Sequence, residues 1–500
     1  MRMQIHAMHA DGAVTLWWEK PEQASGKETF TVTYGDTQLQ TEKTHCTFKD
    51  LPEETVCRFS VFMGDVLLGE TTVKTGKRLR KISVTDFGVV GDGKTMNTQA
   101  LQKAIDACGS DACVMIPEGV YLTGALHLHS DMALCVGKGA VLMGSEAPED
   151  YLPKIHSRFE GTEMECYQSL LNLGTLDHTA GPNCENVLIY GEGEICGGGQ
   201  PLGLRIIEAE RERLRSYIES LGDKVKEYEN NNTIPGRARG RLINLSNCSH
   251  VRITGLTLKN GASWNVHMIY SDHIVTDHCF FQSSGVWNGD GWDPDSSTDC
   301  TLFASRFCTG DDSVAIKSGK NPEGNVIARP TKHIRIFDCF SEGGLGIAVG
   351  SEMSGGVEDV RIWDCDLVHS LYGVQIKATR KRGGYVRDIF VSDSCLSRFL
   401  ICAVKYNDDG VGSDKPPVFE NLGCRRVHFS GWARDYWEKE DHEVACIECT
   451  GFDEPGYEAK HLRFEACTAE RGVQPVLVHC LDVKADVMPS GARWNKRERI

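Results

Sequence analysis

The feature that most constrains this chain is a short apolar phrase that returns at intervals from about residue 183. In chain order it reads ENVLIYG, SHVRITG, DHIVTDHCF, DCTLFASRF, KHIRIFDCF, EDVRIWDCD, RDIFVSDSC and KHLRFEACT. The intervals are 23, 27, 33, 26 and 29 residues, counted from Val251 through Ile274, Thr301, Ile334, Val360 and Ile389. Such a period is typical of a solenoid, in which each repeat buries its apolar face by stacking on the next.

Each repeat is expected to be one coil of strand, turn, strand and turn, because glycine and asparagine separate short β-like runs. Leucine-rich, ankyrin and helical repeats have different signatures and need helices. The sequence therefore predicts an all-β protein built on a right-handed parallel β-helix. Cysteines that fall five residues after the aligned apolar position indicate small hydrophobes stacked from coil to coil in the core. They are Cys279, Cys339, Cys365 and Cys467.

The first 75 or so residues follow a different pattern, in which alternating runs are separated by turn-rich segments. The runs are residues 14–18, 30–34 and 57–62. They predict a small β-sandwich over residues 1–78, followed by the β-helix over 82–490. Trp18 in the second strand and LPEETVCRF further on resemble a fibronectin type III domain, although Cys57 stands where that family has its corner tyrosine.

Two helical segments interrupt the β pattern. Asn97 is a plausible N-cap for a short amphipathic helix, whose apolar residues are Leu101, Ala104, Ile105 and Cys108. An insertion at about 203–229 carries apolar residues between charges, and we expect a solvated helix that packs on one side.

Composition limits the partners and the compartment. Lys+Arg 54 against Asp+Glu 70 gives a net charge of −16, which disfavours nucleic acid as a partner. No secretory leader and no run approaching 18 apolar residues is present, so we expect a cytoplasmic protein that neither spans nor binds a membrane. The 21 cysteines lack the spacing of a zinc site, and we expect them to remain thiols.

Two acidic phrases are candidates for chemistry. NGDGWDPDSSTD begins at Asn288 and TGDDSVAIKSG at Thr309, so Asp290 and Asp311 lie about one coil apart in sequence. Adjacent strands are about 4.8 Å apart, and these aspartates should therefore be neighbours in space. Clustered carboxylates repel each other, so some titrate high while others stay ionised, as general acid and base catalysis needs. A solvated turn or a calcium site is the alternative.

Four separated motifs carry a family resemblance. They are NGDG, GDD, the glycine-rich GGLGIAVGSE and QIK followed by RGG. In this order and spacing they resemble glycoside hydrolase family 28, the polygalacturonase family, over roughly residues 82–480. VTDFGVVGDGK resembles the N-terminal cap of pectin-lyase-like β-helices, and GSEMSGG and SWNVH are similar to the bacterial exo-acting branch.

The resemblance implies roles for particular residues. Asp311 would be the general acid, Asp290 and Asp312 the pair that activates water, and Lys377 the cation that holds the sugar. Further substrate contacts are expected from residues in or beside the motifs. These are Gln375, Asn288, Trp292, Asn265 and His267.

Two departures from the family pattern bear on the substrate. Residues 343–346 contain no histidine, and Gln375 stands where the family has arginine before Ile-Lys. That arginine and the lysine together bind a galacturonate carboxylate, so a replacement cation is needed if the sugar is a uronic acid. Candidates flank the motifs, and we take Arg239 and Arg382 as substrate-binding residues. The other candidates are Arg237, Arg241, Arg380 and Lys381.

The sequence thus predicts an inverting, chain-end-directed hydrolase of α-linked galacturonic acid in pectic oligosaccharides, without cofactor or metal. Water attacking directly places the acid and base carboxylates about 6.5 to 9.5 Å apart. One alternative is the same chemistry on rhamnogalacturonan or on a neutral sugar, such as rhamnose or a pentose of a pectic side chain or plant glycoside. An inert carbohydrate-binding β-helix and a calcium-dependent pectate lyase are the others. The oligomeric state is left open.

Overall fold

The computed structural model describes residues 2–24, 26, 28–228, 232–404, 410–434 and 440–490. The chain forms two compact units: Met1–Ile82 with Gly109–Cys113, and Ser83–Cys108 with Val114–Ile500. The sequence predicts a boundary between 78 and 82 and does not anticipate Gly109–Cys113 in the first unit. Among the described residues, no helix has both the length and the apolar character needed to span a bilayer.

The first unit contains two antiparallel sheets whose inner faces share a core. One sheet consists of β1 (Ile5–Ala10), β2 (Ala13–Trp18) and β5 (His45–Phe48). The other consists of β4 (Thr37–Thr41), β3 (Phe30–Tyr34), β6 (Val56–Met63) and β7 (Val66–Lys74). Trp18 from the first sheet packs with Phe30 and Phe59 from the second. The predicted β-sandwich is confirmed, and its fibronectin type III character stays a prediction.

The second unit is a parallel β-helix, which confirms the predicted fold class. Each full coil contributes three strands rather than the two that the sequence predicts, so the strands stack in three columns. The first column consists of β12 (Met132–Val136), β17 (Cys184–Gly191), β20 (Cys248–Thr254), β23 (Asp272–Asp277), β26 (Thr301–Phe303), β29 (Thr331–Phe337), β32 (Val357–Trp363), β35 (Tyr385–Ser392), β38 (Val418–Arg425), β43 (Ala459–Ala469) and β45 (Cys480–Pro489). The second consists of β10 (Gly119–Thr123), β13 (Ala140–Gly144), β18 (Glu194–Cys196), β21 (Thr257–Lys259), β24 (Phe280–Gln282), β27 (Arg306–Cys308), β30 (Phe340–Gly343), β33 (Asp366–Leu367), β36 (Cys395–Leu396) and β39 (His428–Phe429).

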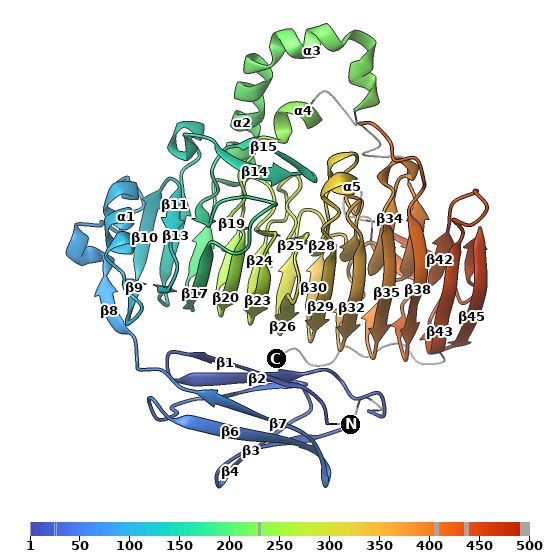
Figure 1. Cartoon of the computed structure of the whole chain (residues 1–500), viewed down its shortest axis with the longest axis horizontal. Coiled ribbons are helices and arrows are strands. Elements are labelled where there is room, and N and C mark those ends of the chain that lie inside the picture. The colour runs from blue at the N-terminus through green and yellow to red at the C-terminus, as the bar shows by residue number, and fades with distance from the viewer. Residues whose placement is uncertain are drawn as a thin grey trace. The chain divides into compact units, whose positions relative to one another are not determined.

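The third column is the 11-stranded sheet on which the candidate site lies, and several of its strands are labelled side by side in Figure 1. It consists of β11 (Leu126–Leu128), β16 (Leu171–Leu173), β19 (Ile243–Ser246), β22 (Val266–Ile269), β25 (Trp292–Asp295), β28 (Val314–Ile316), β31 (Ile347–Val349), β34 (Val374–Ala378), β37 (Phe399–Ala403), β42 (Ile447–Thr450) and β44 (Val476–Val478). β9 (Ala112–Ile116) pairs with β12 at the start of the first column, and β8 (Arg80–Ser83) belongs to the same sheet. Outside the columns are the hairpins β14 (Ile155–Phe159)–β15 (Thr162–Cys166) and β40 (Trp432–Arg434)–β41 (Asp441–Glu443).

The register of the first column agrees with the repeat except at one strand. Val360 pairs with Ile389 as the aligned phrases predict. Thr301, however, pairs with Val275 and Arg335, one residue out of step. The residue in the aligned position is Cys300, which is fully buried. The alignment by large apolar residues overlooks this cysteine and takes Thr301 instead. An error of one residue assigns the side chains of the strand to the wrong face.

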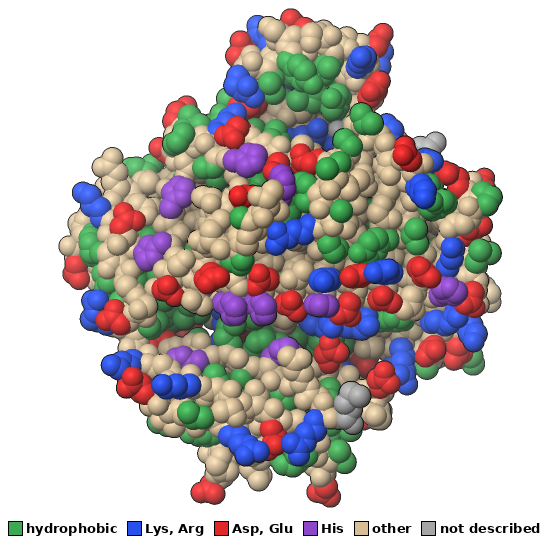
Figure 2. All heavy atoms as spheres, in the orientation of Figure 1, with side chains coloured by type: hydrophobic (Ala, Val, Ile, Leu, Met, Phe, Trp, Pro, Cys, Tyr) green, Lys and Arg blue, Asp and Glu red, His purple; other side chains and the backbone are tan. Residues whose placement is uncertain are grey.

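In the nine first-column strands from β20 to β45, the backbone turns through one residue in the left-handed region, within the first half of the strand or just before it. Asn, Asp and His adopt positive φ more readily than other non-glycine residues, and they fill this turn. In Figure 2 the turn is visible as a row of histidine, acidic and basic side chains across the strands. The residues are His250, His273, Asp299, His333, Asp359, Asp388, Asn421, His461 and Asp482, with φ between 51° and 59°.

The helices match the expectations in part. α1 (Thr98–Asp106) buries its predicted apolar face, but the side chain of its N-cap Asn97 accepts from Val90 N instead of capping the helix. The insertion at 203–229 forms α2 (Gly199–Arg213), α3 (Arg215–Leu221) and a 3₁₀ helix, η3 (Gly222–Glu227). The other helices are η1 (Val84–Phe87), η2 (Pro148–Tyr151), α4 (Thr233–Gly236), α5 (Glu323–Ile327) and η4 (Arg380–Arg382). α2 buries apolar residues such as Leu202 and Ile206 and contacts α4 and η2, whereas α3 buries no residue.

All 21 cysteines lie among the described residues, and no disulfide joins any two of them. Those predicted to stack, such as Cys279 and Cys365, are buried and make weak contacts to backbone carbonyls. We therefore expect thiol titration of the denatured protein, without reductant, to count close to 21 groups. A large deficit would show that disulfides form and that the cysteines are not simply core residues.

Candidate active site

The three predicted aspartates meet at the start of two neighbouring strands of the third column. Asp290 lies just before β25, and Asp311 and Asp312 just before β28. The backbones stack directly, since Gly291 N donates to Asp312 O at 3.0 Å. One carboxylate oxygen of each aspartate lies within 4.8 Å of one from each of the others. The prediction that Asp290 and Asp311 are neighbours is confirmed.

The predicted separation of 6.5 to 9.5 Å between acid and base carboxylates is wrong. The cause is the architecture, because two residues are consecutive in sequence and the third stands on the adjoining strand, about 4.8 Å away. In glycosidases that use two carboxyl groups, a separation of about 5 Å between these groups is typical of a retaining mechanism. Here three carboxylates share the site.

Two buried lysines neutralise the carboxylates. Lys377 on β34 places Nζ 3.0 Å from Asp312 Oδ2. Lys317, which follows β28, lies 3.6 Å from Asp290 Oδ2, 3.9 Å from Asp293 Oδ1 and 3.5 Å from Glu352 Oε2. Sequence reasoning singled out Lys377 but missed Lys317 and Asp293. Both residues lie inside the two acidic phrases. The feature that could have identified them is their position along the strand relative to the catalytic aspartates.

The carboxylates do not titrate alike. Burial raises the pKa of Asp311 to about 6, helped by the charge of Asp312 and opposed by Lys377. Burial, with the charges of Asp293 and Asp311, raises the pKa of Asp290 well above that of an ordinary aspartate. Asp312 instead pairs directly with the Lys377 ammonium group at 3.0 Å. The site therefore holds a carboxyl that stays protonated in mildly acidic solution next to a carboxylate that is paired with a cation.

The lysines also weigh against the calcium interpretation. A divalent cation is held by oxygen ligands whose charge it neutralises. Here the ammonium groups of Lys317 and Lys377 already neutralise the carboxylates that would bind it. Acid and base chemistry is the use that this charge balance supports.

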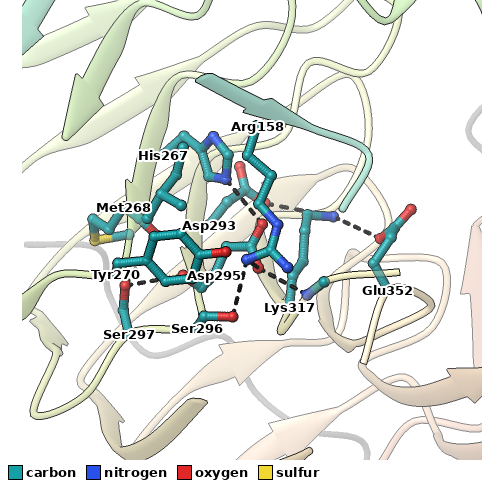
Figure 3. Close-up of polar contacts among 12 residues, drawn as sticks. Arg158, His267, Met268, Tyr270, Asp293, Asp295, Ser296, Ser297, Lys317 and Glu352 are labelled. Carbon is teal, nitrogen blue, oxygen red and sulfur yellow. Dashed lines mark hydrogen bonds and ion pairs between the residues drawn. The ribbon is translucent and has the colours of Figure 1, made fainter. Parts of the chain in front are cut away.

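A second buried network surrounds Asp295 and lies beside Lys317, as Figure 3 shows. Arg158 from the β14–β15 hairpin lies 3.2 Å from Asp295 Oδ1, and His267 Nε2 lies 3.4 Å from Asp295 Oδ2. Arg241 Nε faces Nδ1 of His267 at 3.1 Å, and burial lowers the pKa of this imidazole to about 3. His267 is thus neutral and accepts from Arg241, while its Nε2 hydrogen points to Asp295.

Three predicted substrate contacts have other roles. His267, Asn265 and Trp292 are each fully buried, so a sugar cannot reach them. Asn265 Nδ2 donates to the carbonyl of Asp290 at 2.9 Å and thereby orients that segment. Trp292 Nε1 donates to Thr276 Oγ1 at 3.0 Å inside the coil. The sequence did not indicate this burial, because residues beside a motif on a strand point alternately inward and outward.

The arginines predicted to replace the missing cation are likewise occupied. Arg239 is 1% exposed, donates to Asn288 Oδ1 at 2.6 Å and to Trp287 O at 3.0 Å, and lies over the Trp287 ring. Arg382 is fully buried and donates to Asn321 Oδ1 at 2.6 Å and Ser351 O at 3.0 Å. Both tie loops together, so neither is available to a substrate carboxylate.

The two departures from the motif pattern lie beside the carboxylates. Leu345, within the loop that lacks histidine, donates its N–H to Asp311 O at 3.0 Å. Gln375 on β34 is 5% exposed and its Nε2 lies 3.2 Å from Cys402 Sγ. Its Oε1 is buried and has no hydrogen-bond partner among the described residues. Gln375 therefore offers a neutral acceptor where the resemblance expects a charged donor.

Two family models match this chain. The model of "Glycosyl hydrolases family 28" matches residues 134–404, and that of "Rhamnogalacturonase A/epimerase, pectate lyase-like" matches 81–141. A "Probable polygalacturonase" of Vitis vinifera is 34% identical over 63% of this chain and 60% of its own length. An "Exo-poly-alpha-D-galacturonosidase" of Dickeya chrysanthemi is 28% identical over 67% of this chain and 59% of its own. The chain thus spans about 60% of these curated relatives.

Solved structures show the same fold over more of the chain. The family 28 exopolygalacturonase of Yersinia enterocolitica superposes with a TM-score of 0.79 at 20% identity and covers 98% of both chains. A hyperthermoactive exopolygalacturonase of Thermotoga maritima gives 0.67 at 25% identity and covers 83% of this chain and 93% of its own.

Proposed function

This chain belongs to glycosyl hydrolases family 28, and from that premise we propose that it releases galacturonic acid from the ends of α-linked pectic oligosaccharides. The observation that carries the proposal is the cluster of Asp290, Asp311 and Asp312 with Lys317 and Lys377. An inert carbohydrate-binding protein has no need to bury so many charges. Burying them is costly, and a catalytic use accounts for the cost.

In the proposed reaction, Asp311 donates its proton to the glycosidic oxygen as the bond to the anomeric carbon breaks. A pKa of about 6 keeps a large share of this carboxyl protonated in mildly acidic solution. Asp312, paired with Lys377, removes a proton from the attacking water. Asp290 accepts a hydrogen bond from the same water, and Lys317 fixes the position of Asp290. After each turnover Asp312 releases its proton to solvent and Asp311 takes one up from solvent, so that both return to their starting states.

Action at a chain end is supported by the β14–β15 hairpin. Phe159 of the hairpin stacks on Trp264 at 4.6 Å, and Lys317 Nζ lies over the same indole at 4.5 Å. Lys320 N also donates to Gly161 O at 2.9 Å. The hairpin is therefore fixed beside Lys317, where we expect it to obstruct one direction along which a polymer would extend. Relatives named as exo-acting support the same conclusion.

A neutral sugar is the second candidate substrate, and Gln375 favours it because an amide does not pair with a carboxylate as arginine does. The deciding experiment incubates the protein with defined galacturonate oligosaccharides, rhamnogalacturonan fragments and pentose-bearing glycosides. We expect free galacturonate as the first product from the uronic substrates. Release of rhamnose or a pentose instead would establish the neutral-sugar alternative, and no release from any of them would reject hydrolysis.

The stereochemical prediction is inversion. Water held by Asp312 and Asp290 attacks the anomeric carbon directly, so the first-formed sugar has the opposite anomeric configuration to the substrate. Proton NMR of the product in the first minutes of reaction measures the anomer. A retained configuration would contradict the water-activating pair and would assign one aspartate as a covalent nucleophile, as the short separation suggests for two-carboxylate sites.

A further inference from the structure

The proposed galacturonate substrate needs a cation for its carboxylate beyond Lys377, and the structure removes the arginines that sequence reasoning offered. Arg239 and Arg382 are buried and fully engaged with loop carbonyls and amides. Gln375 is neutral. Lys377 is already bound to Asp312 at 3.0 Å. A substrate carboxylate therefore needs a partly accessible cation from a coil next to Gln375.

Arg398 meets this condition through the stacking of the coils. It immediately precedes β37, the strand next to β34, and Val374 N donates to its carbonyl at 3.2 Å. Gln375 pairs in register with Leu400 on β37, two residues beyond Arg398. The arginine thus stands one coil from Gln375, at a strand spacing of about 4.8 Å.

The side chain of Arg398 is held toward the site by Tyr372. Its guanidinium carbon lies 5.0 Å from the centre of the Tyr372 ring. Tyr372 precedes β34, the strand of Gln375 and Lys377, and its N–H donates to Leu345 O at 3.0 Å, beside Asp311. The charges of Lys377, Arg398 and Asp312 all act on the Tyr372 hydroxyl, whose pKa is raised chiefly by burial. Tyr372 therefore lies between the arginine and the catalytic carboxylates.

Arg398 also has unused hydrogen-bonding capacity. Its side chain is 13% exposed, and its Nε is buried with no hydrogen-bond partner among the described residues. The nearest acidic group is Glu448, at 3.5 Å and itself 40% exposed. An ion pair of this length at a wet edge contributes little, so a substrate carboxylate can replace it. A buried guanidinium nitrogen without an acceptor is costly until such a partner binds.

We propose that Arg398, stacked on Tyr372 and backed by Gln375, forms the subsite that binds the carboxylate of a uronic acid residue next to the cleaved bond. The inference rests on the proposed function and names its substrate class. Arg398, on the neighbouring coil, supplies the positive charge that Gln375 lacks. The Gln375 amide can then bind a neutral oxygen of the same sugar.

The test compares the free-acid and the fully methyl-esterified forms of one galacturonate oligosaccharide, because esterification removes only the carboxylate charge. We expect Arg398→Gln to raise KM for the free acid by roughly 10- to 100-fold, the loss of one charged contact, and to change KM for the ester by no more than about twofold. Arg398→Lys should recover part of the loss. Adding Gln375→Arg to Arg398→Gln should restore preference for the free acid.

Arg387→Gln is the matched control, since Arg387 is also stacked on a tyrosine, Tyr385, and paired with a glutamate, Glu358. It should alter neither KM. Equal changes of both KM values in Arg398→Gln, or none, would overturn the inference, and Arg398→Lys decides the matter if the glutamine variant does not fold. A wild-type protein inactive on both substrates would instead reject the proposed function.

Discussion

Replacing Asp311 with asparagine is expected to lower kcat on natural oligosaccharides by about 10²- to 10⁴-fold while the fold stays intact. The asparagine cannot protonate the departing oxygen, and a sugar leaving group needs that proton. An aryl glycoside with an acidic phenol as leaving group departs without it and should lose much less activity. The pH profile adds a second readout. Activity of the wild type should fall as the pH rises through about 6, where Asp311 loses its proton, and this alkaline decline should vanish in the variant.

The same comparison separates the other aspartates. Asp312→Asn and Asp290→Asn remove groups that act on water, so both classes of substrate should lose activity alike. An Asp311 variant that loses equally on both substrates is not missing its acid, and the assignment of Asp311 and Asp312 would then have to be exchanged.

Replacing Lys317 with methionine is expected to lower the free energy of unfolding by about 3 to 5 kcal/mol at pH 8. The lysine side chain is 5% exposed and faces Asp290, Asp293 and Glu352. Burial alone would lower its pKa, but these carboxylates outweigh burial and raise it. Without the ammonium group, buried negative charges remain without a counterion. Denaturant unfolding at several pH values measures the loss.

The sign of the pH dependence distinguishes charge from packing. Burial already raises the pKa of Asp290 and Asp293 in the folded protein, and loss of the lysine raises it further. Carboxyls whose folded pKa is raised stabilise the fold at low pH and cease to do so as the pH rises through that value. The deficit should therefore be larger at pH 8 than at pH 5. A deficit equal at both would mean that only packing is lost. Lys259→Met, at a partly exposed pair with Glu194, should cost far less.

The fold was predictable because a β-helix repeats its inward-facing residues at a countable interval. The register at β26 was not, because Cys300 occupies the core position and Thr301 beside it looks more strand-like. The third strand of each coil also escaped notice. Those strands, such as β28 and β31, are only three residues long and wholly apolar, so no alternating pattern identifies them.

The residues of the candidate site were predictable where they belong to a recognisable motif. They were not predictable where only the stacking of the coils brings them to the site. Asp290, Asp311 and Lys377 stand within quoted motifs. Whether a neighbouring residue faces sugar or core depends on the direction of one side chain, and here His267 points inward. Arg398 belongs to no motif in the sequence. Its relation to Tyr372 exists only once the coils are stacked.

That the site draws on β25, β28, β31 and β34, four successive strands of one column, has a consequence for how the chain acquires its structure. In a solenoid each coil contacts only its neighbours, so order can spread from coil to coil. While the coil bearing Lys377 is still undocked, the aspartates of the earlier coils face water and need no counterion. Docking of that coil buries the charges and supplies one of their neutralising ammonium groups in a single step. The carboxylates thus lose their contact with water at the same step in which Lys377 neutralises part of their charge. No folding intermediate has to bury these carboxylates without a counterion.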